Sequence, residues 1–126
     1  MNLRYRNEHD AHLGMKLLLA LAFSLLSYLV AFEEQLCDAV LFKLVGGELR
    51  VVAGEAERSV RNVVRNVKRN LSSNCDSVII LVPDEKLRGA VRRKLQRDLP
   101  RQDWTRVGVV TVGQIERFIQ RLGGKK

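Results

Sequence analysis

Residues 37–57 read Cys-Asp-Ala-Val-Leu-Phe-Lys-Leu-Val-Gly-Gly-Glu-Leu-Arg-Val-Val-Ala-Gly-Glu-Ala-Glu, and this stretch decides the fold of the chain. Two runs rich in β-branched and aromatic residues flank Gly46-Gly47, a pattern that predicts a β-hairpin with a two-residue turn. Pairing Val45 with Glu48 sets the register of the two strands. Counting outward along both strands then places Asp38 opposite Glu55.

The opposed carboxylates are the first candidate for a functional site. Residues that face each other across a strand pair have Cβ atoms about 4.5–5.5 Å apart, so Asp38 and Glu55 should be able to share one cation. Because strand side chains alternate between faces, Glu57 joins them if the strand continues that far. Opposed like charges need a proton, a cation or full solvation. The alternative is that Glu55 and Glu57 begin the next helix, whose dipole favours acids in its first turn.

Composition restricts the class of partner. The chain has 126 residues, which suits one domain, and its formal net charge is +8, from 22 basic and 14 acidic residues. Such a basic chain has polyanions as natural partners, although a merely solvated basic surface is the alternative. Neither Cys37 nor Cys75 belongs to a Cys-x-x-Cys pair, so a zinc site is not expected. Both are expected to be small buried side chains of a cytoplasmic protein.

An apolar stretch over residues 15–32 could instead form a signal-peptide core or a short membrane span. The polar residues before it and Glu33-Glu34 after it argue against export. A helix enclosed between a sheet and other helices is also apolar nearly all round. We therefore expect residues 15–27 to pack inside the domain, without stable membrane association. Their expected contact is the apolar face of the hairpin, formed by Val40, Phe42, Leu44, Leu49 and Val51.

The remaining sequence predicts alternating helices and strands. Residues 29–34 either end the first helix or form a strand, and 1–10 and 123–126 are expected to be flexible. The predicted elements are a helix over 11–27, the hairpin over 37–55, a helix over 56–71, a strand over 77–82, a helix over 84–99, a strand over 106–111 and a helix over 112–122. This order predicts a single α/β domain over residues 1–126, with a central mixed sheet flanked by helices.

Two of the predicted helices have outer faces rich in arginine and lysine. The first exposes Arg58, Arg61, Arg65, Lys68 and Arg69, and the second exposes Lys86, Arg88, Arg92, Arg93, Lys94 and Arg97. Such faces suit sequence-neutral contacts to phosphates, and the nucleic-acid-binding candidates are Arg58, Arg61, Arg65, Lys68, Arg92 and Arg93. Few aromatic residues lie in these segments, which argues against a base-stacking surface for single strands.

Over residues 9–122 the chain resembles the PD-(D/E)xK nuclease superfamily, the restriction-endonuclease-like fold that includes Holliday-junction resolvases. In that family an N-terminal helix precedes an acidic residue on the second strand, and a hairpin then leads to a Glu-x-Lys pair, a helix and an apolar strand. Asp38 and Glu55 match the two acids, which are the family's metal ligands. Many members also carry an acid on the first helix, a place that Glu8 or Asp10 could fill.

Position 57 departs from the family pattern, because Glu57 stands where the family has lysine. In the family that lysine helps to hold or polarise the attacking water. Three alternatives stay open. Glu57 is a further metal ligand; a cation of the next helix, Arg61 or Lys68, replaces the lysine; or catalysis is lost and only nucleic-acid binding remains.

The resemblance implies a nuclease that hydrolyses phosphodiester bonds, with DNA as the expected nucleic acid and Mg²⁺ or Mn²⁺ as cofactor. The implied catalytic residues are Asp38, Glu55 and Glu57, and the implied metal ligands are Asp38, Glu55 and the backbone carbonyl of Ala56. Whether the protein is a homodimer is left open. The alternatives to a nuclease are a non-catalytic nucleic-acid-binding or assembly subunit on the same fold, and a small membrane-anchored protein.

Overall fold

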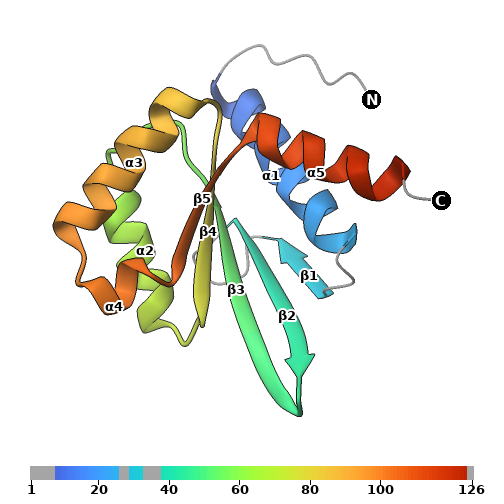
Figure 1. The fold of residues 1–126 in the computed structure, drawn as a ribbon, viewed down its shortest axis with the longest axis horizontal. Coiled ribbons are helices and arrows are strands. Elements are labelled where there is room, and N and C mark those ends of the chain that lie inside the picture. The colour runs from blue at the N-terminus through green and yellow to red at the C-terminus, as the bar shows by residue number, and fades with distance from the viewer. Residues whose placement is uncertain (1–7, 26–28, 33–37, 125–126) are drawn as a thin grey trace.

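A computed structural model describes residues 8–25, 29–32 and 38–124 as one α/β unit built on a five-stranded mixed sheet. The strands follow one another across the sheet in chain order (Figure 1). They are β1 (Leu29–Phe32), β2 (Ala39–Val45), β3 (Glu48–Ala56), β4 (Ser77–Val82) and β5 (Val107–Thr111). The β1–β2 and β2–β3 pairs are antiparallel, whereas β3–β4 and β4–β5 are parallel. The predicted α/β class with a mixed sheet is therefore confirmed.

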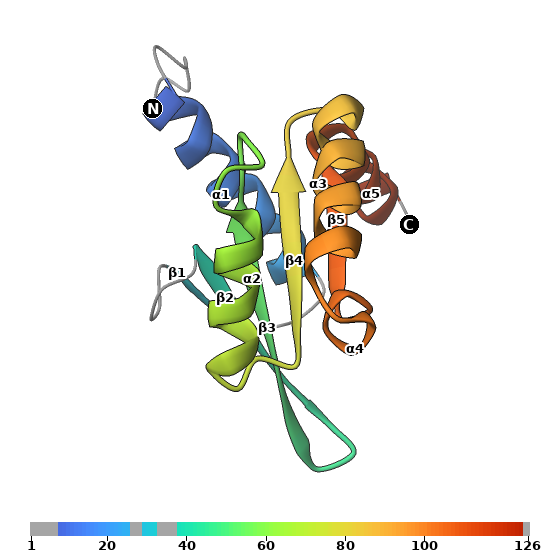
Figure 2. The same ribbon diagram turned by 90° about the vertical axis from the view of Figure 1, so that its left-hand side faces the viewer.

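Helices cover both faces of this sheet (Figures 1 and 2). One face carries α1 (Glu8–Leu25) and α5 (Val112–Gly124), and the other carries α2 (Val63–Ser72), α3 (Glu85–Asp98) and the single turn α4 (Arg101–Trp104). The central strand β4 contributes to both cores, since Ile80 packs on the α2–α3 side and Leu81 on the α1–α5 side. Burial on both faces explains why its sequence is an uninterrupted apolar run.

The β2–β3 hairpin has the predicted turn and register. Gly46 and Gly47 both have positive φ angles, +57° and +85°, as a type I′ two-residue turn requires. Val45 pairs with Glu48, and the ladder continues without a bulge to Ala39 opposite Gly54. The register expected from the sequence is therefore confirmed over this ladder, which ends one pair before Asp38 and Glu55.

The first helix covers the opposite face of the hairpin from the one predicted. Met15 and Leu19 of α1 pack with Ala39 and Leu81, whereas Val40 belongs to the other core. Val40 shares that core with Val63, Val67, Phe42 and Val51, while Leu49 is exposed and the Leu44 side chain lies outside the described residues. Crossovers between adjacent parallel strands share one hand, so α2 and α3 lie on the same face and fill it. The other face is left to α1 and α5.

Several predicted boundaries are corrected. Residues 29–32 form β1 rather than the end of the first helix, and α2 begins at Val63 rather than at residue 56 because β3 extends to Ala56. Residues 8–10 and 123–124, expected to be flexible, belong to α1 and α5. Asp84 caps α3 as expected, with its side chain accepting a hydrogen bond of 2.9 Å from the Leu87 amide. The short helix α4, which follows Pro100, is not among the predicted elements.

Two further expectations concern the apolar helix and the cysteines. None of the helices in the described ranges combines the length and the apolar character needed to cross a membrane. Cys75 is buried and carries a free thiol, as predicted, and Cys37 lies outside the described residues.

Two leucines on α1 test whether this helix is part of the folded core. Leu19 is 0% exposed and Leu17 is 41% exposed, although both are leucines of one helix. We expect Leu19→Ala to lower the free energy of unfolding by about 2–5 kcal/mol, because it leaves a cavity. Leu17→Ala should change it by no more than about 0.5 kcal/mol. Urea denaturation followed by circular dichroism measures both, and equal effects would mean that α1 does not pack as described.

Candidate functional site

Asp38 sits where β2 begins, beside the carboxyl end of β3. Its backbone N–H donates to the Gly54 carbonyl at 3.1 Å, although Gly54 is already the ladder partner of Ala39, so the regular pairing ends at this point. The Asp38 side chain turns across the end of β3, and its Oδ2 accepts a hydrogen bond of 2.8 Å from the Ala56 N–H. The hairpin register thus holds one carboxylate against the last residue of β3.

Two residues of α1 reach the same point. The Lys16 Nζ lies 3.3 Å from Asp38 Oδ1, and both side chains are nearly buried, at 15% and 16% exposed. His12 Nε2 lies 2.7 Å from the Ala56 carbonyl oxygen and 3.5 Å from Asp38 Oδ2. The packing of α1 on this face therefore brings a cation and an imidazole to the carboxylate and to the Ala56 carbonyl.

Glu55 is the most deeply buried acid of the site. It is 4% exposed, its Oε2 accepts a hydrogen bond of 2.6 Å from Asn70 Nδ2, and the Arg69 Nη2 lies 3.7 Å away. Burial raises the pKa of Glu55 to about 7, with smaller upward contributions from Asp38 and Glu57, while the Asn70 hydrogen bond and Arg69 act in the opposite direction. Near neutral pH the Glu55 carboxyl group is therefore partly protonated and partly ionised.

Glu57 follows directly after β3, and its amide donates to the Leu81 carbonyl at 2.9 Å. Its Oε2 accepts a hydrogen bond of 2.7 Å from Asn66 Nδ2. Burial raises its pKa above the ordinary value, and Asp38 raises it further, whereas the Asn66 hydrogen bond, His12 and Arg69 lower it. Asp38 acts on both glutamates, so the structure brings the three predicted acids into one electrostatic cluster, called the acidic cluster below.

The reading of these glutamates as helix-capping residues is wrong. No acid lies in the first turn of α2, and Asn62 occupies its N-cap position. Glu57 instead bonds to the middle of that helix, through Asn66.

Sequence reasoning missed five residues of the site, namely His12, Lys16, Asn66, Arg69 and Asn70. Asn66 and Asn70 are four apart, so one face of α2 presents both amides to Glu57 and Glu55. The spacing of asparagine at 62, 66 and 70 was the available signal. His12 and Lys16 carried a similar signal, because they too are four apart on one helix.

The cations expected to stand in for the family lysine are not the ones found here. Arg61 and Lys68 are exposed. The cations within ion-pair distance of the carboxylates are Lys16 on Asp38 and Arg69 on Glu55. Arg69, expected on the outer basic face, therefore turns inward, and Arg88 likewise donates to the Val109 carbonyl at 2.8 Å instead of pointing into solvent.

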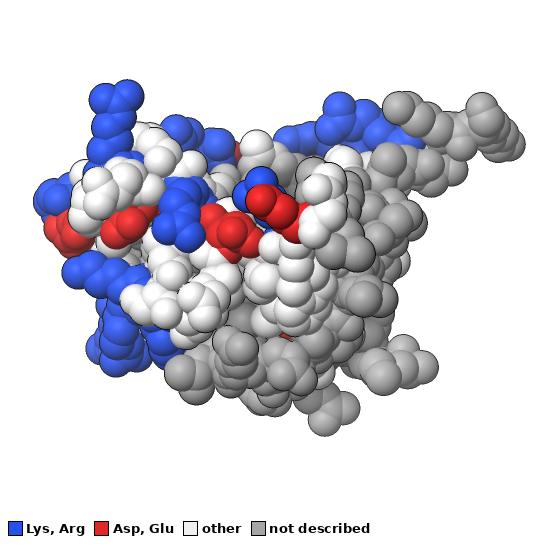
Figure 3. Space-filling view, turned by 90° about the horizontal axis from the view of Figure 1, so that it is seen from below, with Lys and Arg blue, Asp and Glu red and all other residues white. Residues whose placement is uncertain are grey.

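The predicted nucleic-acid-binding residues lie on the α2–α3 side of the molecule, and all are exposed: Arg58, Arg61, Arg65, Lys68, Arg92 and Arg93. Arg58 and Arg61 belong to the segment between β3 and α2 rather than to a helix. At the hairpin end of the molecule, basic side chains gather over α2, α3 and α4 with acidic side chains among them (Figure 3).

A metal centre of three or more side chains is not formed. Within the described residues, no three His, Cys, Asp or Glu side chains are grouped so that they could hold a metal ion. The predicted ligand set is smaller, with two carboxylates and the Ala56 carbonyl, and these atoms lie at one end of β3. The side chains of Glu8, His9 and Asp10 lie outside the described residues.

Comparison of the chain with protein-family models, curated proteins and solved structures gave no match.

The buried carboxyl of Glu55 should make stability depend on pH. Its pKa rises from an ordinary 4.5 to about 7 on folding, so the folded state holds the proton more tightly than the unfolded state. The contribution of Glu55 to stability is then most favourable below about pH 4.5 and is lost as pH rises to about 7. Glu55→Gln should therefore stabilise the fold more at pH 8 than at pH 4.5. The difference between its effects on the free energy of unfolding at the two pH values should be about 2–3 kcal/mol.

Chemical denaturation at the two pH values measures this difference. Glu48→Gln is the matched control, because Glu48 is an exposed acid at the other end of the same strand, and it should show no such difference. An equal effect of Glu55→Gln at both pH values would show that the carboxyl does not hold its proton in the fold.

Proposed function

We propose that the chain is a nuclease-like nucleic-acid-binding domain that hydrolyses phosphodiester bonds with the help of a divalent cation at the acidic cluster. The observation that carries the proposal is the burial of Glu55 beside Asp38 and Glu57, which raises its pKa to about 7. Holding several carboxylates close together lowers the stability of the folded state, and a purely structural role would not require such an arrangement. Clusters of this kind are characteristic of sites that bind cations or transfer protons.

The order of elements supports the same proposal. The PD-(D/E)xK resemblance implies a helix, an acid on the second strand, a hairpin, an acidic pair, a helix and an apolar strand. In the structure α1 comes first, Asp38 directly precedes β2, Glu55 lies near the end of β3 and Glu57 directly follows it, before α2 and β4. The restriction-endonuclease-like fold is thus part of the proposal, together with the DNA substrate.

The residues present fit a divalent cation in part. Asp38 and Glu55 are oxygen ligands of the kind that Mg²⁺ and Mn²⁺ prefer, and each glutamate is bonded by its asparagine through Oε2. The Ala56 carbonyl would complete the set through its second lone pair, since His12 Nε2 already lies 2.7 Å from this oxygen. A bound Mg²⁺ or Mn²⁺ would supply a Lewis acid that polarises a phosphate oxygen and lowers the pKa of a water.

Lys16 is the proposed replacement for the family lysine. It comes from α1 rather than from the acidic pair, yet its ammonium group lies 3.3 Å from Asp38 Oδ1. From there a positive charge can hold an attacking water or a phosphate oxygen, which is the role that Glu57 cannot fill. His12 and Lys16 are four residues apart and lie on the same side of α1, so this helix delivers both polar groups to the carboxylates.

The second candidate is a nucleic-acid-binding subunit without catalysis. It is favoured by Glu57, which replaces the lysine of the motif, and by the contacts of Asp38, which already has the Ala56 amide and Lys16 as partners. In such a protein a proton, rather than a metal cation, would neutralise the buried Glu55 carboxylate, in keeping with its raised pKa.

Cleavage assays separate the two candidates. We expect the wild-type protein to cleave linear, branched or single-stranded DNA with Mg²⁺ or Mn²⁺, and EDTA should abolish cleavage. Asp38→Asn and Lys16→Met should each lower the rate by about 100-fold or more, because each removes a group that acts on the reacting phosphate. Glu116→Gln, which changes an exposed acid on α5, is the control and should leave the rate unchanged.

Cation binding is measured separately, by the shift of the unfolding temperature with Mn²⁺, which should be lost in Asp38→Asn. Glu57→Lys then tests the role of position 57. It should weaken Mn²⁺ binding if Glu57 is a ligand, and raise cleavage if Glu57 marks a decayed site. A wild-type protein that neither binds Mn²⁺ nor cleaves any of these substrates would leave the binding subunit as the account of this chain.

The basic surface predicts a second result. Replacing Arg61, Arg65 and Lys68 together with alanine should weaken nucleic-acid binding about equally for all sequences, because phosphate contacts carry no sequence information. The slope of log affinity against log salt should shrink by about 2–3, near 0.9 for each lost phosphate contact. Fluorescence anisotropy measured between about 50 and 200 mM salt gives this slope.

The double variant Arg117→Ala, Arg121→Ala on α5 is the control for the loss of positive charge, since both arginines are exposed on the opposite face of the sheet. If it weakens binding as much as the triple variant does, the effect comes from net charge, and α2 is not the interface.

A further inference from the structure

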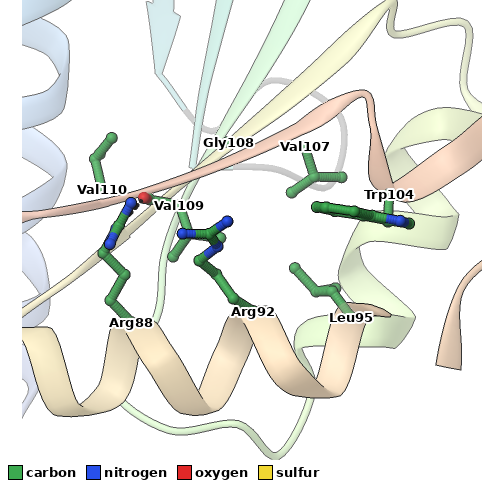
Figure 4. A pocket seen from close by; sticks show the side chains of 8 residues that line it. All are labelled: Arg88, Arg92, Leu95, Trp104, Val107, Gly108, Val109 and Val110. Atoms are coloured by element: carbon green, nitrogen blue, oxygen red, sulfur yellow. Dashed lines mark hydrogen bonds between the residues drawn. The ribbon is translucent and has the colours of Figure 1, made fainter. Parts of the chain in front are cut away.

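A small cavity opens along the free edge of the sheet. β5 is the last strand of the sheet, and a cavity of about 250 Å³ lies between its outer edge and α3 (Figure 4). Leu95, Trp104 and Val107 form its apolar wall, and the side chains of Arg88 and Arg92 project into it from α3. It is smaller than the roughly 300–1,000 Å³ of sites for drug-sized ligands, so it suits a single side chain rather than a cofactor.

The backbone of β5 leaves hydrogen-bonding groups at this cavity. The Arg106 carbonyl accepts from the Val78 amide of β4, at 3.0 Å, so every second residue from Arg106 faces β4. Val107, Val109 and Thr111 therefore turn their N–H and C=O groups to the outer edge. Two of those groups are capped by side chains, because Arg88 Nε donates to the Val109 carbonyl and Gln114 Oε1 accepts from the Thr111 amide.

At Val107 and Val109, three of the outward backbone groups have no such cap from a described side chain. Among the described residues, no side chain bonds to the N–H or C=O of Val107 or to the N–H of Val109. Gly108, between them, is exposed and has no atom within 4 Å of the place where a Cβ would stand. A short length of edge strand is thus open to pairing, beside an apolar cavity of side-chain size.

We propose that this groove binds an extended acidic peptide of a partner protein, which adds to β5 as a further strand. The peptide backbone pairs with the open groups of Val107 and Val109, and one apolar side chain enters the cavity against Leu95 and Trp104. An Asp or Glu of the peptide pairs with Arg92. This binding site is independent of the acidic cluster and of its chemistry.

Charge on the groove argues for an acidic partner. Arg88 is already held by the Val109 carbonyl and by Glu85, whose Oε1 lies 2.8 Å from Nη1. Arg92 is exposed, and no described carboxylate lies within ion-pair distance of it, although its guanidinium lies beside the strand edge in Figure 4. Among the described residues that line the groove, Arg92 is therefore the cation without a carboxylate within ion-pair distance.

A peptide fits this groove better than a nucleic acid does. In the view of Figure 4 the Trp104 ring is seen edge-on between Val107 and Leu95, with its edge rather than a face toward Arg92. A stacked base needs an open ring face, which is not offered here. The row of outward N–H and C=O groups is instead the feature that an extended peptide recognises.

Trp104 provides the measurement, because it is the single tryptophan of the chain and lines the cavity. The probes are three pools of acetylated five-residue peptide amides, in which a central Val, Leu, Ile or Phe is flanked by Asp and Glu. This first pool is called the acidic pool. The lysine pool has Lys in place of the acids, and the N-methylated pool keeps the acids but has N-methylated backbone amides. Oligothymidylate is the fourth probe.

We expect the acidic pool to shift Trp104 fluorescence in a saturable way. N-methylation should weaken binding about tenfold or more, since it removes backbone hydrogen bonds, and the lysine pool should not bind. Arg92→Gln should weaken the acidic pool about tenfold, as the loss of one charge-assisted pair does. Arg93→Gln, at the exposed neighbouring position, should leave binding unchanged.

Three results would overturn the proposal. Equal binding of the N-methylated pool would exclude strand addition, and equal binding of the lysine pool would exclude an acidic partner. A response to oligothymidylate alone, or to none of the probes, would mean that the edge of β5 is a nucleic-acid contact or simply a protected sheet edge.

Discussion

The register of the β2–β3 hairpin is the constraint on which the site depends. Two glycines with positive φ set the turn, and each later pair along the ladder follows from it, ending with Ala39 opposite Gly54. Because the side-chain period of a strand is two, a slip of one residue would move Glu55 to the other face of the sheet. It would then lie under α1 instead of against Asn70. The turn therefore decides, from about eight residues away, which helix each acid meets.

The acids and the two helices around them stabilise one another. Glu55 is buried and Glu57 is half-buried, and α2 supplies each with a donor, Asn70 and Asn66, which lie one turn apart. Asp38 lies on the other side of the β3 end and takes its partners from the Ala56 amide and from Lys16 of α1. Helices on opposite faces of the sheet thus meet at one strand end. Burial there raises the pKa of Glu55 to about 7, so ionising this carboxyl group near neutral pH lowers the stability of the fold.

The parallel half of the molecule has a different role. Two crossovers of the same hand place α2 and α3 on one face, and their outer surfaces carry the exposed arginines and lysines. The same arrangement leaves β5 at the edge of the sheet with α3 beside it, where Arg88 caps one carbonyl and Arg92 stands next to the cavity. The acidic cluster and the β5 groove lie on different strands, whereas Arg92 belongs both to the predicted nucleic-acid-binding residues and to the lining of the groove.

The α/β class, the hairpin turn, the register of its ladder, the apolar strand β4 and the capped helix α3 could all be predicted from the sequence. Each of these follows from local rules, because glycine allows positive φ, strands alternate with period two, and Asp84 accepts from an amide three residues on. Local rules also indicated Asp38, Glu55 and Glu57 as members of one site, since they follow from a single register.

The sequence did not predict which helix covers which face of the sheet or which side chains complete the site, because both depend on tertiary packing. Lys16 is 22 residues from Asp38 in the chain, and Asn70 is 15 from Glu55, so their meeting depends on the packing of α1 and α2 on opposite faces of the sheet. The inward turn of Arg69 and the place of Trp104 at the edge of β5 have the same origin. The periodicity of apolar residues shows which face of a helix or strand is apolar. Which other element packs on that face depends on the handedness of the connections and on which surface of the sheet is still uncovered.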